Sequence, residues 1–311
     1  MKRFWLAAIV GLSFVAGPAA AQVRIDAATA QRLADRGVTT AEAAQRVTTL
    51  LGRTLGDPAV AAATSPEGLA EAVEARAQLI VDTRAELSRL ATTLEALPPL
   101  PNPDNLDLVR SAEQDGRNTA ELARRSDSIL EAFQTIPEAV RTRDQARFNA
   151  AVGKITAGSV LMQQAQAAMM RAQAGMQDPN WPSHAQFLAM ACLSDAQAAM
   201  QSGMSGGQPR PEAVSAMEMA ETCVRDQVAR GRALLDADDT NPVRVRLHPL
   251  DVELFDAMND AIGCVAAARG AVGRMDGPGA IAGAFNACYA PIGGRVTGLI
   301  NRQHQILAAA T

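Results

Sequence analysis

The sequence predicts an all-α protein, in which an antiparallel long-helix coiled-coil bundle is followed by a disulfide-stapled four-helix bundle. Apolar residues recur at helical spacing through most of the chain, prolines and glycines divide this pattern into segments, and all four cysteines lie beyond residue 190. Aromatic residues make up only 3% of the chain, so the core must come from aliphatic side chains, Met and close contacts between Ala-rich helices.

Residues 1–21 have the features of a secretory signal peptide. Lys2 and Arg3 precede an apolar run over residues 4–16, and three alanines at 19–21 form a small-residue cleavage site. The apolar run is shorter than the roughly 20 residues that a spanning helix needs. We therefore expect cleavage near Ala21, a mature chain that starts at Gln22 in the periplasm or outside the cell, and no transmembrane segment in it.

The charge of the mature chain argues against nucleic-acid binding. Loss of Lys2 and Arg3 changes the formal net charge from −4 to −6, and an acidic surface repels phosphate. The next segment, residues 22–64, predicts short N-terminal helices that are interrupted at Gly37 and at Asp57-Pro58.

Residues 65–177 predict the long-helix antiparallel coiled-coil domain. Its first helix starts at the N-cap Ser65 with Pro66 at the first helical position, and its core side chains recur every seven residues: Val73, Ile80, Leu87 and Leu94. A second helix is expected over residues 104–134, and Pro137 is expected to start the third. The third repeats the seven-residue spacing with Phe148, Ile155, Met162, Met169 and Met176.

The methionines of this third helix are interpreted as core side chains. They continue a stripe that begins with Phe148 and Ile155, and small residues follow three positions after the stripe residues. Met is a flexible gap filler, so a metal is not needed to explain the pattern.

Residues 183–311 predict the four-helix bundle with two disulfides, after a break at the mature chain's single tryptophan, Trp181. Its helices are expected at about 183–201, 211–237, 250–272 and 279–308. The stretch between the middle two helices, residues 243–249, alternates apolar and basic residues, which predicts a short strand or an extended connector.

The cysteines indicate two disulfides, because an even number in an exported chain is typical of a disulfide framework. Residues at equal distance from an antiparallel turn lie level with each other. This predicts Cys192 with Cys223, and Cys264 with Cys288. The pairing Cys223 with Cys264, which leaves Cys192 for Cys288, is the alternative.

Metal binding has only weak candidates in the sequence. Met200 and Met204 lie one helical turn apart, and His184 is the nearest imidazole in sequence. There is no Cys-x-x-Cys spacing and no pair of histidines one helical turn apart.

The sequence contains no catalytic motif, phosphate-binding loop or dinucleotide fingerprint. We therefore predict a non-catalytic protein without a cofactor, which acts as an interaction or scaffold component of the cell envelope and contacts an envelope protein or another copy of itself through long helices. The alternative is a periplasmic carrier of an apolar ligand or of Cu(I) through the Met-rich region.

Overall fold

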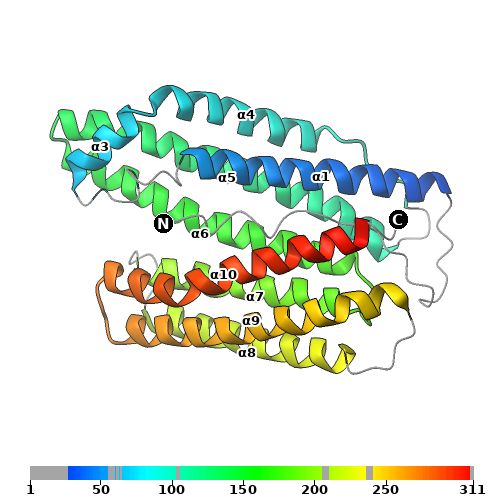
Figure 1. The fold of residues 1–311 in the computed structure, drawn as a ribbon. Helices are drawn as coiled ribbons and strands as arrows, with labels where there is room; N and C mark the ends of the chain where they lie inside the picture. The colour runs from blue at the N-terminus through cyan, green and yellow to red at the C-terminus, as the bar shows by residue number, and fades with distance from the viewer. Residues whose placement is uncertain are drawn as a thin grey trace.

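The computed structural model describes residues 27–54, 60, 63, 65–102, 106–204, 210–235 and 241–308. The signal-peptide residues and Asp57-Pro58 lie outside this part of the chain. All of the secondary structure in the described residues is helical, as the sequence predicts. Figure 1 shows the helices as two bundles lying side by side.

The first bundle contains α1 (Ala27–Thr54), α3 (Pro66–Glu74), α4 (Ala77–Glu95), α5 (Asp107–Arg141) and α6 (Gln145–Gly175). The second contains α7 (Pro182–Met204), α8 (Arg210–Leu235), α9 (Pro242–Gly273) and α10 (Pro278–Ala308). In the first bundle the predicted seam of Val73, Ile80, Leu87 and Leu94 is buried. The prediction of a single helix from Ser65 onward was wrong, because the chain turns between α3 and α4 at Ala75 and Arg76.

The expectation of short helices before residue 65 was also wrong, since α1 runs unbroken for 28 residues. A glycine inside a helix costs only about 1 kcal/mol relative to alanine. The buried side chains of Leu33, Thr40, Ala44 and Val47 recur at helical spacing on either side of Gly37 and hold α1 against the bundle.

Pro137 lies inside α5 and does not start a helix, contrary to the prediction. Ile136 and Ala139 on either side of it are buried, so the apolar face continues past the proline. The turn comes at Arg143, whose φ is 51°, and Asp144 then caps α6 by accepting a hydrogen bond from the Arg147 amide at 2.9 Å.

Helix α6 contributes to the cores of both bundles. Ala165 and Met169 pack in the first core, whereas Ala167 and Met170 pack in the second. The Met residues of α6 therefore fill core space, as the sequence predicts. Tight packing against α5 depends on Gly158, because a β-carbon there would lie 2.6 Å from the side chain of Ile129.

In the second bundle α9 starts earlier than expected, and residues 243–249 are helical. Asn241 caps the helix by accepting from the amides of Val243 and Arg244, and Pro242 occupies the first turn. The alternation of apolar residues was misleading because Leu247 and Leu250 face the core at helical spacing, while Val245 is exposed.

Candidate functional site

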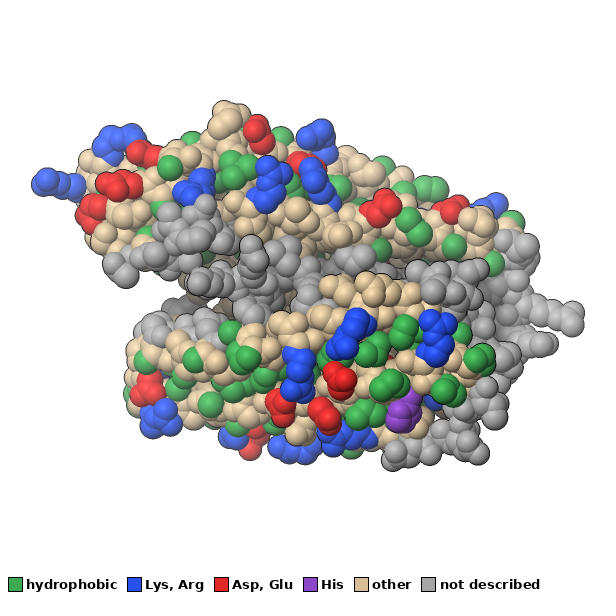
Figure 2. Space-filling view, viewed as in Figure 1, with side chains coloured by type: hydrophobic (Ala, Val, Ile, Leu, Met, Phe, Trp, Pro, Cys, Tyr) green, Lys and Arg blue, Asp and Glu red, His purple; other side chains and the backbone are tan. Residues whose placement is uncertain are grey.

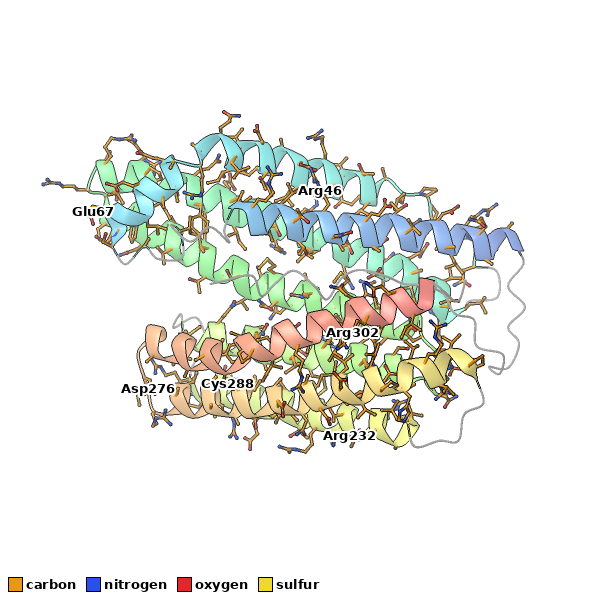
Figure 3. The ribbon with its side chains drawn as sticks, in the orientation of Figure 1. Arg46, Glu67, Arg232, Asp276, Cys288 and Arg302 are labelled. Carbon is orange, nitrogen blue, oxygen red and sulfur yellow. A yellow bond between two sulfur atoms is a disulfide. The ribbon has the colours of Figure 1, made fainter. Side chains whose placement is uncertain are left out.

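The two disulfides join the helices of each hairpin in the second bundle. Cys192 of α7 pairs with Cys223 of α8, with Cα atoms 6.0 Å apart, and Cys264 of α9 pairs with Cys288 of α10, with Cα atoms 5.5 Å apart. Both predicted pairs are confirmed. Cys288 lies in the half of α10 that is nearer to Asp276, and Asp276 belongs to the turn between α9 and α10 (Figure 3).

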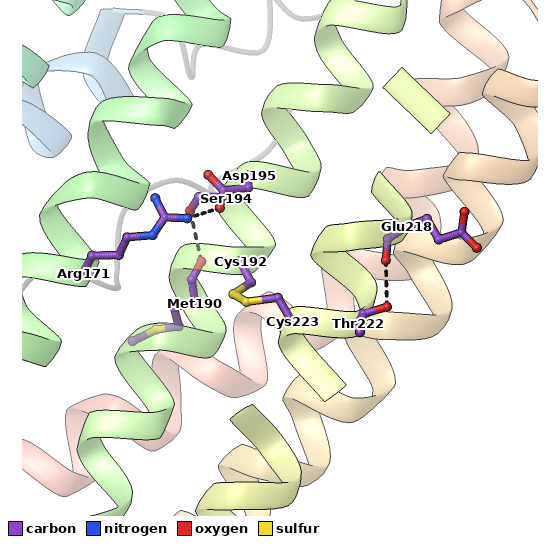
Figure 4. Close-up of a disulfide and its surroundings, with 8 residues drawn as sticks. All are labelled: Arg171, Met190, Cys192, Ser194, Asp195, Glu218, Thr222 and Cys223. Carbon is purple, nitrogen blue, oxygen red and sulfur yellow. Dashed lines mark hydrogen bonds and ion pairs between the residues drawn. A yellow bond between two sulfur atoms is a disulfide. The ribbon is translucent and has the colours of Figure 1, made fainter. Parts of the chain in front are cut away.

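The first disulfide lies beside the contact between the two bundles (Figure 4). Arg171 of α6 forms an ion pair with Asp195 of α7, three residues after Cys192. Burial raises the pKa of Asp195, and the Arg171 guanidinium opposes that shift. The disulfide thus links α8 to α7, and α7 is the helix through which the second bundle contacts α6.

The structure places His184 far from Met200 and Met204, the other weak metal candidates of the sequence. His184 and Met200 lie sixteen residues apart on the single helix α7, which places their backbones about 24 Å apart. Met200 is buried and Met204 is partly buried, and both pack in the second core. Among the described residues, no group of three or more His, Cys, Asp and Glu side chains is placed to hold a metal ion.

His184 is used in a contact with the first bundle. Its Nδ1 lies 2.9 Å from the carbonyl oxygen of Ala174, so this nitrogen carries the proton and donates it to the carbonyl. Burial lowers the pKa of His184, and the hydrogen bond to Ala174 partly offsets that effect. His184 therefore connects α7 to the end of α6 through this hydrogen bond.

The connection between the bundles is also held by arginines. The guanidinium of Arg244 lies 5.3 Å from the ring centroid of Trp181 and donates to the carbonyl of Leu234 near the end of α8. Arg230 donates to the carbonyl of Pro179 at 3.1 Å. These contacts fix the segment between α6 and α7 against α8 and against the start of α9.

A buried carboxylate, Asp251, lies deeper at the same end of the second bundle. Its Oδ1 accepts a hydrogen bond from Gln186 of α7 at 2.7 Å and another from Gln303 of α10 at 2.5 Å. Asp251 is only 7% exposed, and burial raises its pKa to about 6. The two amides, then His248 and Arg244, act in the opposite direction.

The first bundle contains a second carboxylate of this kind. Asp115 of α5 is 2% exposed, and burial raises its pKa to about 7, against the effect of a hydrogen bond with Gln173 of α6. Its Oδ1 has no hydrogen-bond partner. In the described part of the chain each bundle therefore contains a buried aspartate whose pKa is raised by burial.

The outward side of α10 differs from these polar sites because most of its exposed side chains are small and uncharged. Gly283, Arg295 and Arg302 of this helix are exposed, and so is a row of residues at alternating intervals of four and three: Ala280, Ala284, Ala287, Pro291, Gly294, Gly298, Asn301 and Gln305. We call the residues of this row the α10 face. A β-carbon added at Gly294 or Gly298 would meet no atom within 4 Å, so the space beyond the helix is open there.

The two arginines of α10 are occupied by neighbouring carboxylates. Arg295 pairs with Asp260 at 3.2 Å and Arg302 pairs with Glu253 at 3.5 Å, and both acids belong to α9. Figure 2 shows hydrophobic and uncharged atoms along much of α10, and most charged atoms of this bundle lie over α8 and α9.

Comparison with known proteins gives no relative, since no protein-family model, curated protein sequence or solved structure matches this chain. In the described residues no helix is both long and apolar enough to cross a membrane.

The sequence reasoning missed both the Asp251 cluster and the α10 face. The available signal for Asp251 was its spacing, because it lies four residues after Leu247 and four before Phe255, which are both buried. The signal for the α10 face was a heptad-like recurrence of Ala and Gly. Such a pattern predicts a buried helix face as long as the positions of the other helices in the bundle are unknown.

Proposed function

We propose that the mature chain is a non-catalytic, exported protein that binds another helix through the α10 face and acts as an interaction or scaffold component of the cell envelope. The observation that carries this proposal is the α10 face itself. Its residues from Ala280 to Gln305 are all exposed although they follow the spacing of a coiled-coil seam.

The chemistry of the α10 face favours a helical partner. Small side chains allow two helix backbones to approach closely, and the face spans about 38 Å. The charged residues beside the face, Arg295 and Arg302, are each paired with a carboxylate of α9, so a partner helix that covers the face meets no unpaired charge from α10. Asn301 and Gln305 add amides at one end, which can fix the register of the pair.

A second copy of this chain has the chemistry that the face requires. Two antiparallel α10 helices related by a two-fold axis present the same small and uncharged residues to each other. Arg295 and Arg302 do not oppose their counterparts strongly, since each is neutralised by a carboxylate of α9. A different envelope protein with an uncharged helix is the other outcome that the experiment below distinguishes.

The proposed location outside the cytoplasm is supported by two observations. The N-terminal 21 residues have the composition of a signal peptide, and both hairpins of the second bundle are closed by disulfides, which persist in oxidising compartments.

A carrier function is the second candidate, and the position of two thioethers favours it. Met200 and Met204 are one turn apart on α7 and both pack in the second core, where an apolar ligand or Cu(I) would have to bind.

Native mass spectrometry of the mature chain, purified from its own envelope, separates these functions. We expect a mass for residues 22–311 less the four hydrogens lost in two disulfides, in a complex with a second copy or with another polypeptide and without a small ligand. A monomer with a stoichiometric copper ion or organic adduct would contradict the proposal and support the carrier. A monomer with nothing bound would contradict both.

A further inference from the structure

We infer that Asp251, Gln186 and Gln303 form a proton-operated latch, which holds the C-terminal part of α10 to α7 and α9 when Asp251 is protonated and loosens when Asp251 is ionised. The inference goes beyond the docking proposal and does not depend on it, because the latch lies inside one chain.

The side chain of Asp251 forms a bridge between α7, α9 and α10. Helix α10 packs most extensively on α9, and the disulfide Cys264–Cys288 ties these helices near the other end of α10. Gln303 lies five residues before the end of α10, and its amide meets the amide of Gln186 from α7 at one carboxylate oxygen of Asp251. One side chain of α9 thus joins three helices.

The protonated carboxyl group suits this bridge better than the ionised form. Both amides donate to Oδ1, so a proton on Oδ2 leaves the two hydrogen bonds in place. The ionised form keeps them too, but it holds a negative charge away from water. No salt bridge joins Asp251 to a cation in the described part of the chain. Ionisation therefore strains the closed arrangement, and opening relieves it.

The charged groups around Asp251 reduce the rise in its pKa but do not abolish it. On α9, Arg244 and His248 lie on the same side of the helix and favour the ionised form. Arg244 is also engaged with Trp181 and with the end of α8, and Arg302 of α10 is paired with Glu253. On α7, His184 is two residues before Gln186 and donates to Ala174.

The direction of the pH effect follows from the raised pKa. In the closed state the pKa of Asp251 is about 6, whereas in the open state the carboxyl group regains its ordinary value of 3.8. The closed state therefore binds the proton more tightly. Stabilisation of the closed state is complete below the lower value, falls as the pH rises between the two values, and is lost above about pH 6.

The test is hydrogen exchange of the mature chain between pH 4 and 8, corrected for intrinsic exchange rates. We expect the opening of backbone amides near Gln303 to increase by roughly tenfold per pH unit between about pH 4 and 6, and then to level off. The variant D251N keeps an oxygen acceptor without a titrating group, so its opening should not change with pH. E253Q is the matched control, because it removes an exposed acid that also ties α9 to α10 and leaves Asp251 in place.

The latch would be refuted if wild type and D251N gave the same pH profile, or if the profile were lost in E253Q and kept in D251N. Carbon-13 NMR of the aspartate side chains in the wild-type chain gives an independent measurement of the pKa of Asp251. We expect one carboxyl carbon, absent from the spectrum of D251N where that variant folds, to titrate near pH 6. Titration of all aspartates other than Asp115 near pH 4 would overturn the inference.

Discussion

Removal of both disulfides is expected to lower the free energy of unfolding of the second bundle by about 7 kcal/mol, since each bond contributes about 3 to 4 kcal/mol. The bonds close loops with sequence separations of 31 and 24 residues, and loops of this size restrict the unfolded chain substantially. The second core also depends on Ala and Met more than on aromatic side chains, so little other stabilisation is available to replace the bonds.

The measurement is urea unfolding of the double variants C192A/C223A and C264A/C288A and of the variant that lacks all four cysteines. A reductant serves as the control, because it should destabilise the wild-type chain by a similar amount and leave the four-cysteine variant unchanged. If the reductant did not shift the unfolding transition of the wild-type chain, the disulfides would not have the structural role assigned to them.

Replacement of Gly231 by alanine is expected to destabilise the second bundle by about 3 kcal/mol. A β-carbon at this position of α8 would lie 2.0 Å from Cζ of Phe255 in α9, well inside van der Waals contact. Phe255 is fully buried and cannot turn its ring away without moving other core side chains. The overlap therefore outweighs the helix propensity of about 1 kcal/mol that alanine gains over glycine.

Gly263 supplies the matched control for this substitution. It lies on α9, and a β-carbon there would meet no atom within 4 Å, so G263A should be neutral or slightly stabilising. The double variant G231A/F255L should recover part of the loss, because leucine vacates the position of the distal ring atoms. Equal stability of G231A and G263A in thermal unfolding would show that α8 and α9 do not approach as closely as described.

Periodicity and cysteine placement were sufficient to predict the fold class from the sequence. The heptad spacing of residues such as Ile80 and Leu87 identifies buried helix faces, and symmetry about the turns identifies both disulfides. Local helix signals were less reliable. Pro137 and Gly37 suggested helix ends, but each lies in a helix whose buried face continues on both sides, and tertiary packing outweighs a local cost of about 1 to 3 kcal/mol.

The candidate sites could not be predicted because they depend on the relative positions of several helices. Gln186, Asp251 and Gln303 are far apart in the sequence, and only the packing of α7, α9 and α10 brings them to one oxygen atom. The α10 face is visible as a spacing of small residues in the sequence. Its exposure becomes evident only when Arg295 and Arg302 are seen to turn toward α9.

Photo-crosslinking in the cell that makes this protein tests the central claim most directly. A photoreactive residue in place of Ala287, at the middle of the α10 face, should give a crosslinked product of the mass of two chains, or of this chain with a different protein. The same residue in place of Gly263, which is exposed on α9, should give little product. Introduction of a charge by G294E should abolish the product from position 287. Equal crosslinking at the two positions, or none at Ala287, would contradict the account of α10 as the helix that binds the partner.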